Sequence, residues 1–163
     1  MSAELPHTVK VVTLWLLAGL LLFLGIQWWQ HGQQQLRFRA DGDIVELRRG
    51  PDGHYRWPGR INGQAVDFLV DTGASGTAIP ASLARSLRLD PLGSVQSNTA
   101  GGRVEGQLVR ADVALQGGVV ARNLRVVALP GLDGNPLLGM DVLGRLHLQQ
   151  RDGVLRIDLR AAR

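Results

Sequence analysis

The 163-residue sequence predicts a fold dominated by β-strands, closed as a small barrel or sandwich and preceded by a single transmembrane helix. Three observations support this fold class: an uncharged apolar run near the amino terminus, short apolar stretches separated by turn residues, and two short stretches of helical character. Once the membrane segment is subtracted, the remaining length suffices for one compact domain.

The amino-terminal part divides into a tail (residues 1–10), a transmembrane helix (residues 11–29) and a stalk (residues 30–42). The second segment is uncharged and, as a helix, long enough to cross a hydrocarbon core of ~30 Å with little tilt. A cleaved signal peptide is the alternative interpretation. It is disfavoured because Gln-Trp-Trp-Gln-His follows the apolar run, where a cleavage site needs small residues. We therefore expect an uncleaved anchor.

Residues 43–163 form the folded domain, in which turn residues punctuate the apolar stretches. Four turn signals predict four β-hairpins, at residues 50–53, 62–63, 117–118 and 152–153. Two short helices are predicted as well, at residues 80–89 and 141–146. The sequence contains no internal repeat, so each motif of the domain occurs once.

Arginine supplies almost all of the positive charge, because Lys10 is the single lysine and the formal net charge is +4. Such a balance is compatible with an anionic membrane surface or with nucleic acid. The arginines are scattered singly along strand-like segments, without a basic run or interleaved aromatics, so we expect solvated strand faces and no nucleic-acid partner. The absence of cysteine excludes disulfides and thiolate zinc sites, and the four histidines lack metal-ligand spacing.

The feature that carries chemistry is an apolar strand, residues 68–70, which runs directly into Asp71-Thr72-Gly73. The strand fixes the direction of the Asp71 carboxylate, the glycine lets the backbone approach closely, and the amides of the turn can hydrogen-bond the carboxylate. Taken alone, the tripeptide is more often an ordinary Asx turn. Its assignment to catalysis therefore depends on the motifs that accompany it.

Two further motifs follow the order and spacing of a known family. Residues 59–63 read Gly-Arg-Ile-Asn-Gly, and residues 137–143 place two aliphatic residues and a glycine before a short helix. With these motifs and the Asp-Thr-Gly-Ala-Ser run, the sequence resembles the retropepsin-like aspartic peptidases, specifically the small bacterial membrane-anchored type. The resemblance covers about residues 53–159. It implies a small closed β-barrel with a flap hairpin and one or two short helices.

The resemblance also implies a role for each motif residue. Asp71 is the catalytic carboxylate, and the residues after it support the active site: Thr72, Gly73, Ala74 and Ser75. The candidate flap comprises Asn98, Thr99, Ala100, Gly101 and Gly102, with an ordinary polar hairpin as the alternative. The structural helix motif comprises Leu138, Gly139, Met140 and Asp141.

One Asp-Thr-Gly motif is half of an aspartic active site. The mechanism needs two carboxylates that share a proton: one deprotonates a water that attacks the peptide carbonyl, and the other donates a hydrogen bond to the carbonyl oxygen. Asp141 is the tempting second carboxylate, but the matching family position has a structural role. Because the motif occurs once, two chains are expected to form a homodimer, with one Asp71 from each at the two-fold axis.

The expected function is that of a membrane-anchored aspartic endopeptidase acting on a peptide or protein substrate, with no cofactor and no metal, because water is the nucleophile. The alternative is a non-catalytic retropepsin-like binding or scaffold domain tethered to the membrane. The positive-inside rule does not decide orientation, since Lys10 precedes the apolar segment and Arg37 and Arg39 follow it. The anchored members of the family predict a single-pass inner membrane protein with a periplasmic peptidase domain.

Overall fold

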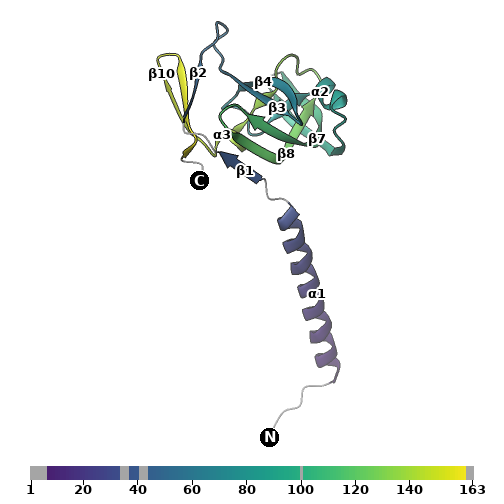
Figure 1. Ribbon diagram of the computed structural model, residues 1–163. Coiled ribbons are helices and arrows are strands. Elements are labelled where there is room, and N and C mark those ends of the chain that lie inside the picture. Colours follow the sequence, from purple (N-terminus) through teal and green to yellow (C-terminus); the bar gives the residue numbers. More distant parts are fainter. Residues whose placement is uncertain (1–6, 34–36, 41–43, 100, 161–163) are drawn as a thin grey trace. The chain divides into compact units, whose positions relative to one another are not determined.

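The computed structural model describes residues 7–33, 37–40, 44–99 and 101–160, and it divides into two compact units, Met1–Gln35 and Leu36–Arg163 (Figure 1). The first unit contains one helix, α1 (His7–Gln33), whose side chains from residue 13 to residue 26 are all exposed. Within the fully described part of the chain, no helix combines the length and the apolar character that crossing a membrane requires. The predicted membrane span therefore remains a prediction.

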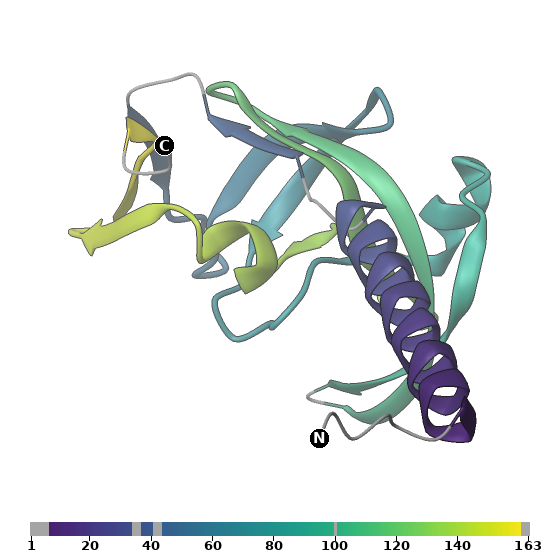
Figure 2. The same cartoon turned by 90° about the horizontal axis from the view of Figure 1, so that it is seen from below.

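Regular structure occupies much of the segment predicted to be a stalk. The helix α1 continues to Gln33, and β1 (Arg37–Ala40) pairs antiparallel with β8 (Val119–Leu129). Figure 2 shows this short strand, in blue, beside the long green β8. Four residues are too few for period-two alternation to distinguish a strand from a polar linker, which is why the sequence pattern did not reveal β1.

The second unit is built around an eight-stranded sheet in the order β1-β8-β5-β9-β4-β3-β7-β6, and an additional pairing between β7 and β8 closes it. The closed ring contains β8, β5, β9, β4, β3 and β7, with β1 and β6 attached outside it. The predicted closed β-barrel is thus confirmed. The remaining strand bounds in this sheet are Arg56–Ile61 (β3), Gln64–Val70 (β4), Ala78–Pro80 (β5), Pro91–Thr99 (β6), Gly102–Leu115 (β7) and Leu137–Leu138 (β9).

A separate three-stranded antiparallel sheet has the order β10-β11-β2 (Figure 1). Its strands are β10 (His147–Arg151), β11 (Val154–Asp158) and β2 (Ile44–Arg48). Two short helices complete the domain, α2 (Ala81–Ser86) and α3 (Met140–Leu143). Both predicted helices therefore form, each shorter than its sequence pattern suggested.

Three of the four predicted hairpins form: β3 with β4, β7 with β8, and β10 with β11. The turn at residues 50–53 also reverses the chain, since the Gly50 N–H donates to the His54 carbonyl (2.8 Å) and Arg49 makes a single β-bridge with Tyr55. However, β2 pairs with β11 and not with β3. This hairpin prediction was wrong because a local turn signal does not specify which strand becomes the partner.

The core of the barrel connects directly to the strand end that carries the Asp-Thr-Gly turn. Trp57, Phe68, Ile79 and Leu138 are fully buried. The indole N–H of Trp57 donates to the Gln116 carbonyl (2.9 Å), which satisfies the one polar atom of that side chain. Because β4 and β9 each contribute one of these buried side chains, their ends are fixed by core packing.

Candidate active site

Asp71 lies directly after β4, and the chain there forms a tight turn. The Asp71 N–H donates to the Leu138 carbonyl (3.0 Å), which ties the turn to β9. The Oδ1 atom of Asp71 accepts a hydrogen bond from the Gly73 N–H (2.9 Å), and the Ala74 N–H donates to the Asp71 carbonyl (3.3 Å). The turn is therefore an Asx turn, the ordinary alternative raised by the sequence, and the same bonds orient the half-buried Asp71 carboxylate.

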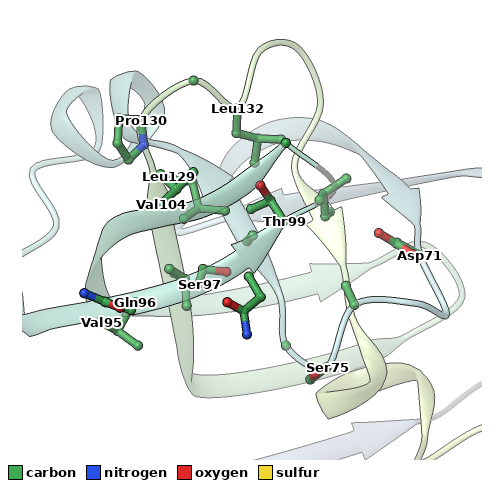
Figure 3. Close-up of a pocket in the computed structure, with 18 of the residues that line it drawn as sticks. Asp71, Ser75, Val95, Gln96, Ser97, Thr99, Val104, Leu129, Pro130 and Leu132 are labelled. Carbon is green, nitrogen blue, oxygen red and sulfur yellow. The ribbon is translucent and has the colours of Figure 1, made fainter.

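The Asp71 turn borders a cleft of about 830 Å³, within the size range of ligand-binding sites. Figure 3 shows the turn residues Asp71 and Ser75 and the hairpin residues Ser97 and Thr99 around the same space. Among the described residues that line the cleft, Asp71 is the only carboxylate. The apolar part of the lining comprises Ala74, Ala78, Val95, Val104, Val127, Leu129, Pro130, Leu132 and Leu137.

The segment predicted as a flap forms the tip of the β6–β7 hairpin. Thr99 pairs with Gly102, and the Thr99 hydroxyl donates to the Gly102 carbonyl (2.8 Å). Gly102 has φ 108°, a backbone conformation that favours glycine. Asn98, Thr99 and Gly101 line the same cleft as Asp71, whereas Ala100 lies outside the described residues.

The loop after Asp71 is held by the helix α3. The Thr77 N–H donates to Oδ2 of Asp141 (3.0 Å), and the Thr77 hydroxyl donates to Oδ1 of Asp141 (2.9 Å). The Gly139 N–H donates in turn to the Thr77 hydroxyl (3.3 Å), and the Met140 N–H donates to the Ala74 carbonyl (2.9 Å). Both oxygens of the Asp141 carboxylate are thus used in holding the loop, which positions the turn that precedes it.

Gly139 allows the loop and the helix to approach closely. A Cβ atom at Gly139 would lie 2.4 Å from the carbonyl carbon of Gly76 and 2.5 Å from its oxygen. Real Cβ atoms do not approach backbone atoms so closely, so any side chain here must separate the two segments. The glycine of the helix motif is therefore required by contact between backbones.

Thr72 is placed differently from its neighbours in the motif. It is exposed and does not line the Asp71 cleft. It instead borders a shallower depression of about 420 Å³ together with Gly73, Ala74, Ser75, Met140 and Asp141. The structure therefore brings the predicted support residues and the helix motif together beside Asp71.

Sequence reasoning missed Thr77, a threonine whose side chain is fully buried. Its signal was a threonine directly before the apolar residues of β5, a position where an unpaired hydroxyl would be costly. The loop of residues 130–132, which lines the cleft, was missed as well. No group of three or more His, Asp or Glu side chains in the described ranges is arranged to hold a metal ion.

The carboxyl groups with clearly lowered pKa values lie outside the cleft. Hydrogen bonds from the Arg56 guanidinium lower the pKa of Asp52 to about 2, at the turn between β2 and β3. The Arg160 guanidinium likewise lowers the pKa of Asp158 at the end of β11. Both are exposed ion pairs at chain turns or ends, where solvent screens them.

The closed six-strand barrel, with one Asp-Thr-Gly turn braced by a short helix, defines the class of retropepsin-like aspartic proteases. Comparison with known proteins agrees. A family profile described as "gag-polyprotein putative aspartyl protease" matches residues 57–145, more than half of the chain. The chain belongs to this retropepsin-like aspartic protease family.

The individual proteins that resemble the chain share low sequence identity with it. The chain is 34% identical over 118 residues to the "Uncharacterized protein in cobV 5'region" of Sinorhizobium sp, with 69% of this chain and 51% of the relative aligned, so it spans about half of that relative's length. The crystal structure of a retropepsin-like aspartic protease from Rickettsia conorii superposes with a TM-score of 0.57 at 22% identity, covering 76% of this chain and 96% of that one. This likeness supports the fold. The Simian Foamy Virus (mac) protease, with a TM-score of 0.42, 20% identity and coverage of 55% and 91%, adds no weight.

Proposed function

We propose that the chain is an aspartic endopeptidase that hydrolyses peptide bonds at a pair of Asp71 carboxylates, one from each of two chains. The observation that carries the proposal is the position of Asp71: its carboxylate is oriented by the Gly73 N–H and borders a cleft that the β6–β7 hairpin tip also lines. The alternative, a non-catalytic binding or scaffold domain, is compatible with the Asx turn but gives no reason for its carboxylate to border the cleft.

The chemistry requires two carboxylates that share one proton. The ionised carboxylate takes a proton from water as the water oxygen adds to the peptide carbonyl carbon, and the protonated carboxyl donates a hydrogen bond to the carbonyl oxygen. The tetrahedral intermediate then collapses: the carboxyl group that took the proton from water gives it to the nitrogen, the C–N bond breaks, and a carboxylic acid and an amine result. The described lining contributes Asp71 as its one carboxylate, which supports our proposal that the second carboxylate comes from another copy of the chain.

The lining of the cleft supports a peptide with apolar side chains as the substrate. Val104, Leu129 and Leu132 supply apolar surface, and Ser97 and Asn98 of the hairpin supply polar groups. A mostly apolar site with a few polar groups is suited to bury side chains while fixing the main chain of a ligand. We therefore expect preference for apolar residues next to the cleaved bond.

We further propose that residues 11–29 attach the enzyme to the inner membrane and that the peptidase domain lies in the periplasm. The described α1 side chains, residues 13–26, are apolar or small except Thr13, and all are exposed within their own unit. A helix that is apolar around its whole circumference is typical of a membrane segment or a deeply buried core. Attachment to a plane would also raise the effective concentration of two domains that must meet.

The orientation is tested by adding protease to spheroplasts. Digestion of the domain in intact spheroplasts is expected for a periplasmic domain. Protection until the cells are lysed would place the domain on the cytoplasmic side.

The peptidase activity is tested with the Asp71→Asn variant, incubated with a diverse peptide library. We expect cleavage to fall by at least about 10²–10⁴-fold, because the shared proton of the carboxylate pair is lost. Asp67→Asn, on the exposed side of the same strand β4, is the matched control and should retain activity. Wild-type cleavage by the Asp71 variant would refute the assignment, and peptide binding without cleavage by the wild type would favour the scaffold alternative.

A further inference from the structure

Arginines gather on the outside of the barrel along the paired strands β7 and β8. Arg110 stands opposite Arg125 in the β7–β8 register, and Arg37 stands opposite Arg122 in the β1–β8 register. The Arg110 and Arg125 side chains therefore share one face of the sheet, because directly opposite residues of antiparallel strands do so. Arg110, Arg122 and Arg125 are called the basic face below, with Arg37 at the adjoining register position.

A β-bulge in β8 places Arg122 and Arg125 on the same side of the sheet. Between two paired positions, β7 contributes one residue, Asp112, whereas β8 contributes two, Arg122 and Asn123. Asn123 adopts φ 58°, which accommodates the extra residue. In a regular strand, residues three apart point to opposite faces, but with this bulge Arg122 and Arg125 are both exposed on the outside.

No ion pair within the described part of the chain engages the arginines of the basic face. The three ion pairs between described residues involve Arg56, Arg151 and Arg160, and none involves the basic face. The Nε atom of Arg110 is buried without a hydrogen-bond partner.

One carboxylate shares the basic face. It belongs to Asp112, and its Oδ1 atom accepts the Asn123 N–H (2.7 Å), which holds the bulge. Like charges directly opposite each other destabilise a sheet. The arrangement therefore favours an external anionic partner that compensates the repulsion.

We propose that the basic face binds the anionic phospholipid headgroups of the membrane that carries the chain. The proposal rests on the membrane attachment proposed above and adds a second contact to it. Only residues 34–36 separate the end of α1 from β1, so the strand that adjoins the basic face directly follows the apolar helix. Guanidinium groups pair with phosphate through two parallel N–H···O bonds, and clustered arginines next to a membrane segment are attracted to anionic lipid.

Two other anionic partners fit the basic face less well. An acidic side chain of a peptide substrate would lie in the cleft, but none of the three arginines lines it. Single-stranded nucleic acid is normally held by aromatic side chains that stack on bases, and neither of the strands that carry the basic face, β7 and β8, contains an aromatic residue. A planar array of phosphates needs neither a cleft nor a stacking platform.

The absence of cysteine from the sequence makes the test direct, because a single introduced cysteine can carry one fluorophore. The full chain is labelled through Val120→Cys, next to the basic face on β8, or through Gln149→Cys on β10 as the control position. Each labelled chain is reconstituted into nanodiscs of phosphatidylcholine alone or with added phosphatidylglycerol, both containing lipids with a nitroxide quencher on the headgroup.

We expect stronger quenching of the Val120 label in the anionic nanodiscs, falling at high salt because screening weakens the attraction. The double variant Arg122→Gln/Arg125→Gln should lose this difference. Arg151→Gln/Arg156→Gln, which removes the same charge from the other sheet, should keep it. The Gln149 label should respond less than the Val120 label.

Three outcomes would overturn the proposal. Equal quenching in neutral and anionic nanodiscs would show that the attached domain does not use the basic face to bind lipid. Failure of the chain to enter nanodiscs at all would instead refute the membrane attachment on which the proposal rests. Arginine-dependent binding of a single-stranded oligonucleotide, without a lipid effect, would assign the basic face to nucleic acid. Peptidase activity is measured separately, so its absence is distinguishable from each of these results.

Discussion

The Asp71 loop and the β6–β7 hairpin tip border the same cleft, but they are held in different ways. The loop is tied to β9 and α3 by backbone bonds and by the Thr77–Asp141 pair, which is partly or fully buried. The hairpin tip is exposed, and β6 pairs with β7 alone. A region with many buried bonds opens rarely, whereas an exposed hairpin opens at low cost in free energy. We therefore expect a fixed carboxylate and, at the hairpin tip, a flap that moves more easily.

The largest predicted effect concerns the close contact between Gly139 and the backbone of Gly76. Gly139→Ala forces a Cβ atom against the Gly76 backbone, so we expect the free energy of unfolding to fall by about 3 kcal/mol and cleavage to be lost with it. Gly76→Ala is the matched control, because its Cβ atom would meet only Oδ2 of Asp141, at 3.9 Å. Urea unfolding of both variants measures the difference, and equal stability would mean that the contact does not hold the loop.

The next effect concerns the carboxylate that braces the loop. Asp141→Ala leaves the Thr77 N–H and hydroxyl without their acceptor, so we expect a loss of about 2–3 kcal/mol in the free energy of unfolding. Asp133→Ala removes an exposed carboxylate and should change stability by less than about 0.5 kcal/mol. Thermal unfolding of the two variants side by side is the measurement. A small effect at Asp141 would count against a rigid loop.

A change in the hairpin tip should alter activity without altering stability. Thr99→Val removes the hydroxyl bond to Gly102, and we expect unfolding to change by less than about 0.5 kcal/mol because the site is exposed. The kcat/KM for peptide should fall several-fold, since the tip lines the cleft. Ser94→Ala on the same strand, outside the lining, should leave both quantities unchanged. Equal losses of stability and activity at Thr99 would contradict our expectation of a flap that moves without unfolding of the domain.

The smallest predicted effect concerns Asp52, at the turn between β2 and β3 and outside the cleft. Because Arg56 lowers the pKa of Asp52 to about 2 in the folded chain, against ~3.9 unfolded, the pair contributes stability above pH ~4 and loses it as pH falls through about 2. An NMR titration of the Asp52 carboxyl should show a midpoint near 2, and Arg56→Gln should raise it. An unchanged midpoint in that variant would remove Arg56 as the cause. Cleavage activity should be unaffected by the substitution.

The sequence predicted the parts of this fold that local chemistry determines. The Asn62-Gly63 and Asp152-Gly153 turns have the positive φ values that their hairpins require, and both hairpins form. The turn at Asp71 was also recognisable, because a buried strand runs straight into Asp-Thr-Gly. These features depend on residues adjacent in the chain.

The features that the sequence did not reveal depend on residues far apart in the chain. The pairing of β2 with β11 and the bond between Thr77 and Asp141 each join segments that no local pattern relates. The candidate site was therefore predictable as a set of motifs, whereas the way in which α3 braces the loop was not. The helix motif gave Gly139 by resemblance, and its physical reason, contact with Gly76, required the structure.

The central claim is that two copies of Asp71 form one active site, and mixing of subunits tests it most directly. Wild-type and Asp71→Asn chains with different affinity tags are combined in equal amounts, and recovery of both tags in one complex verifies subunit exchange. If the site is shared, about a quarter of the dimers keep two carboxylates, so activity should fall to about a quarter of that of the same amount of wild-type dimer. Activity that stays near one half after verified exchange would show that each chain works alone and would contradict the shared site.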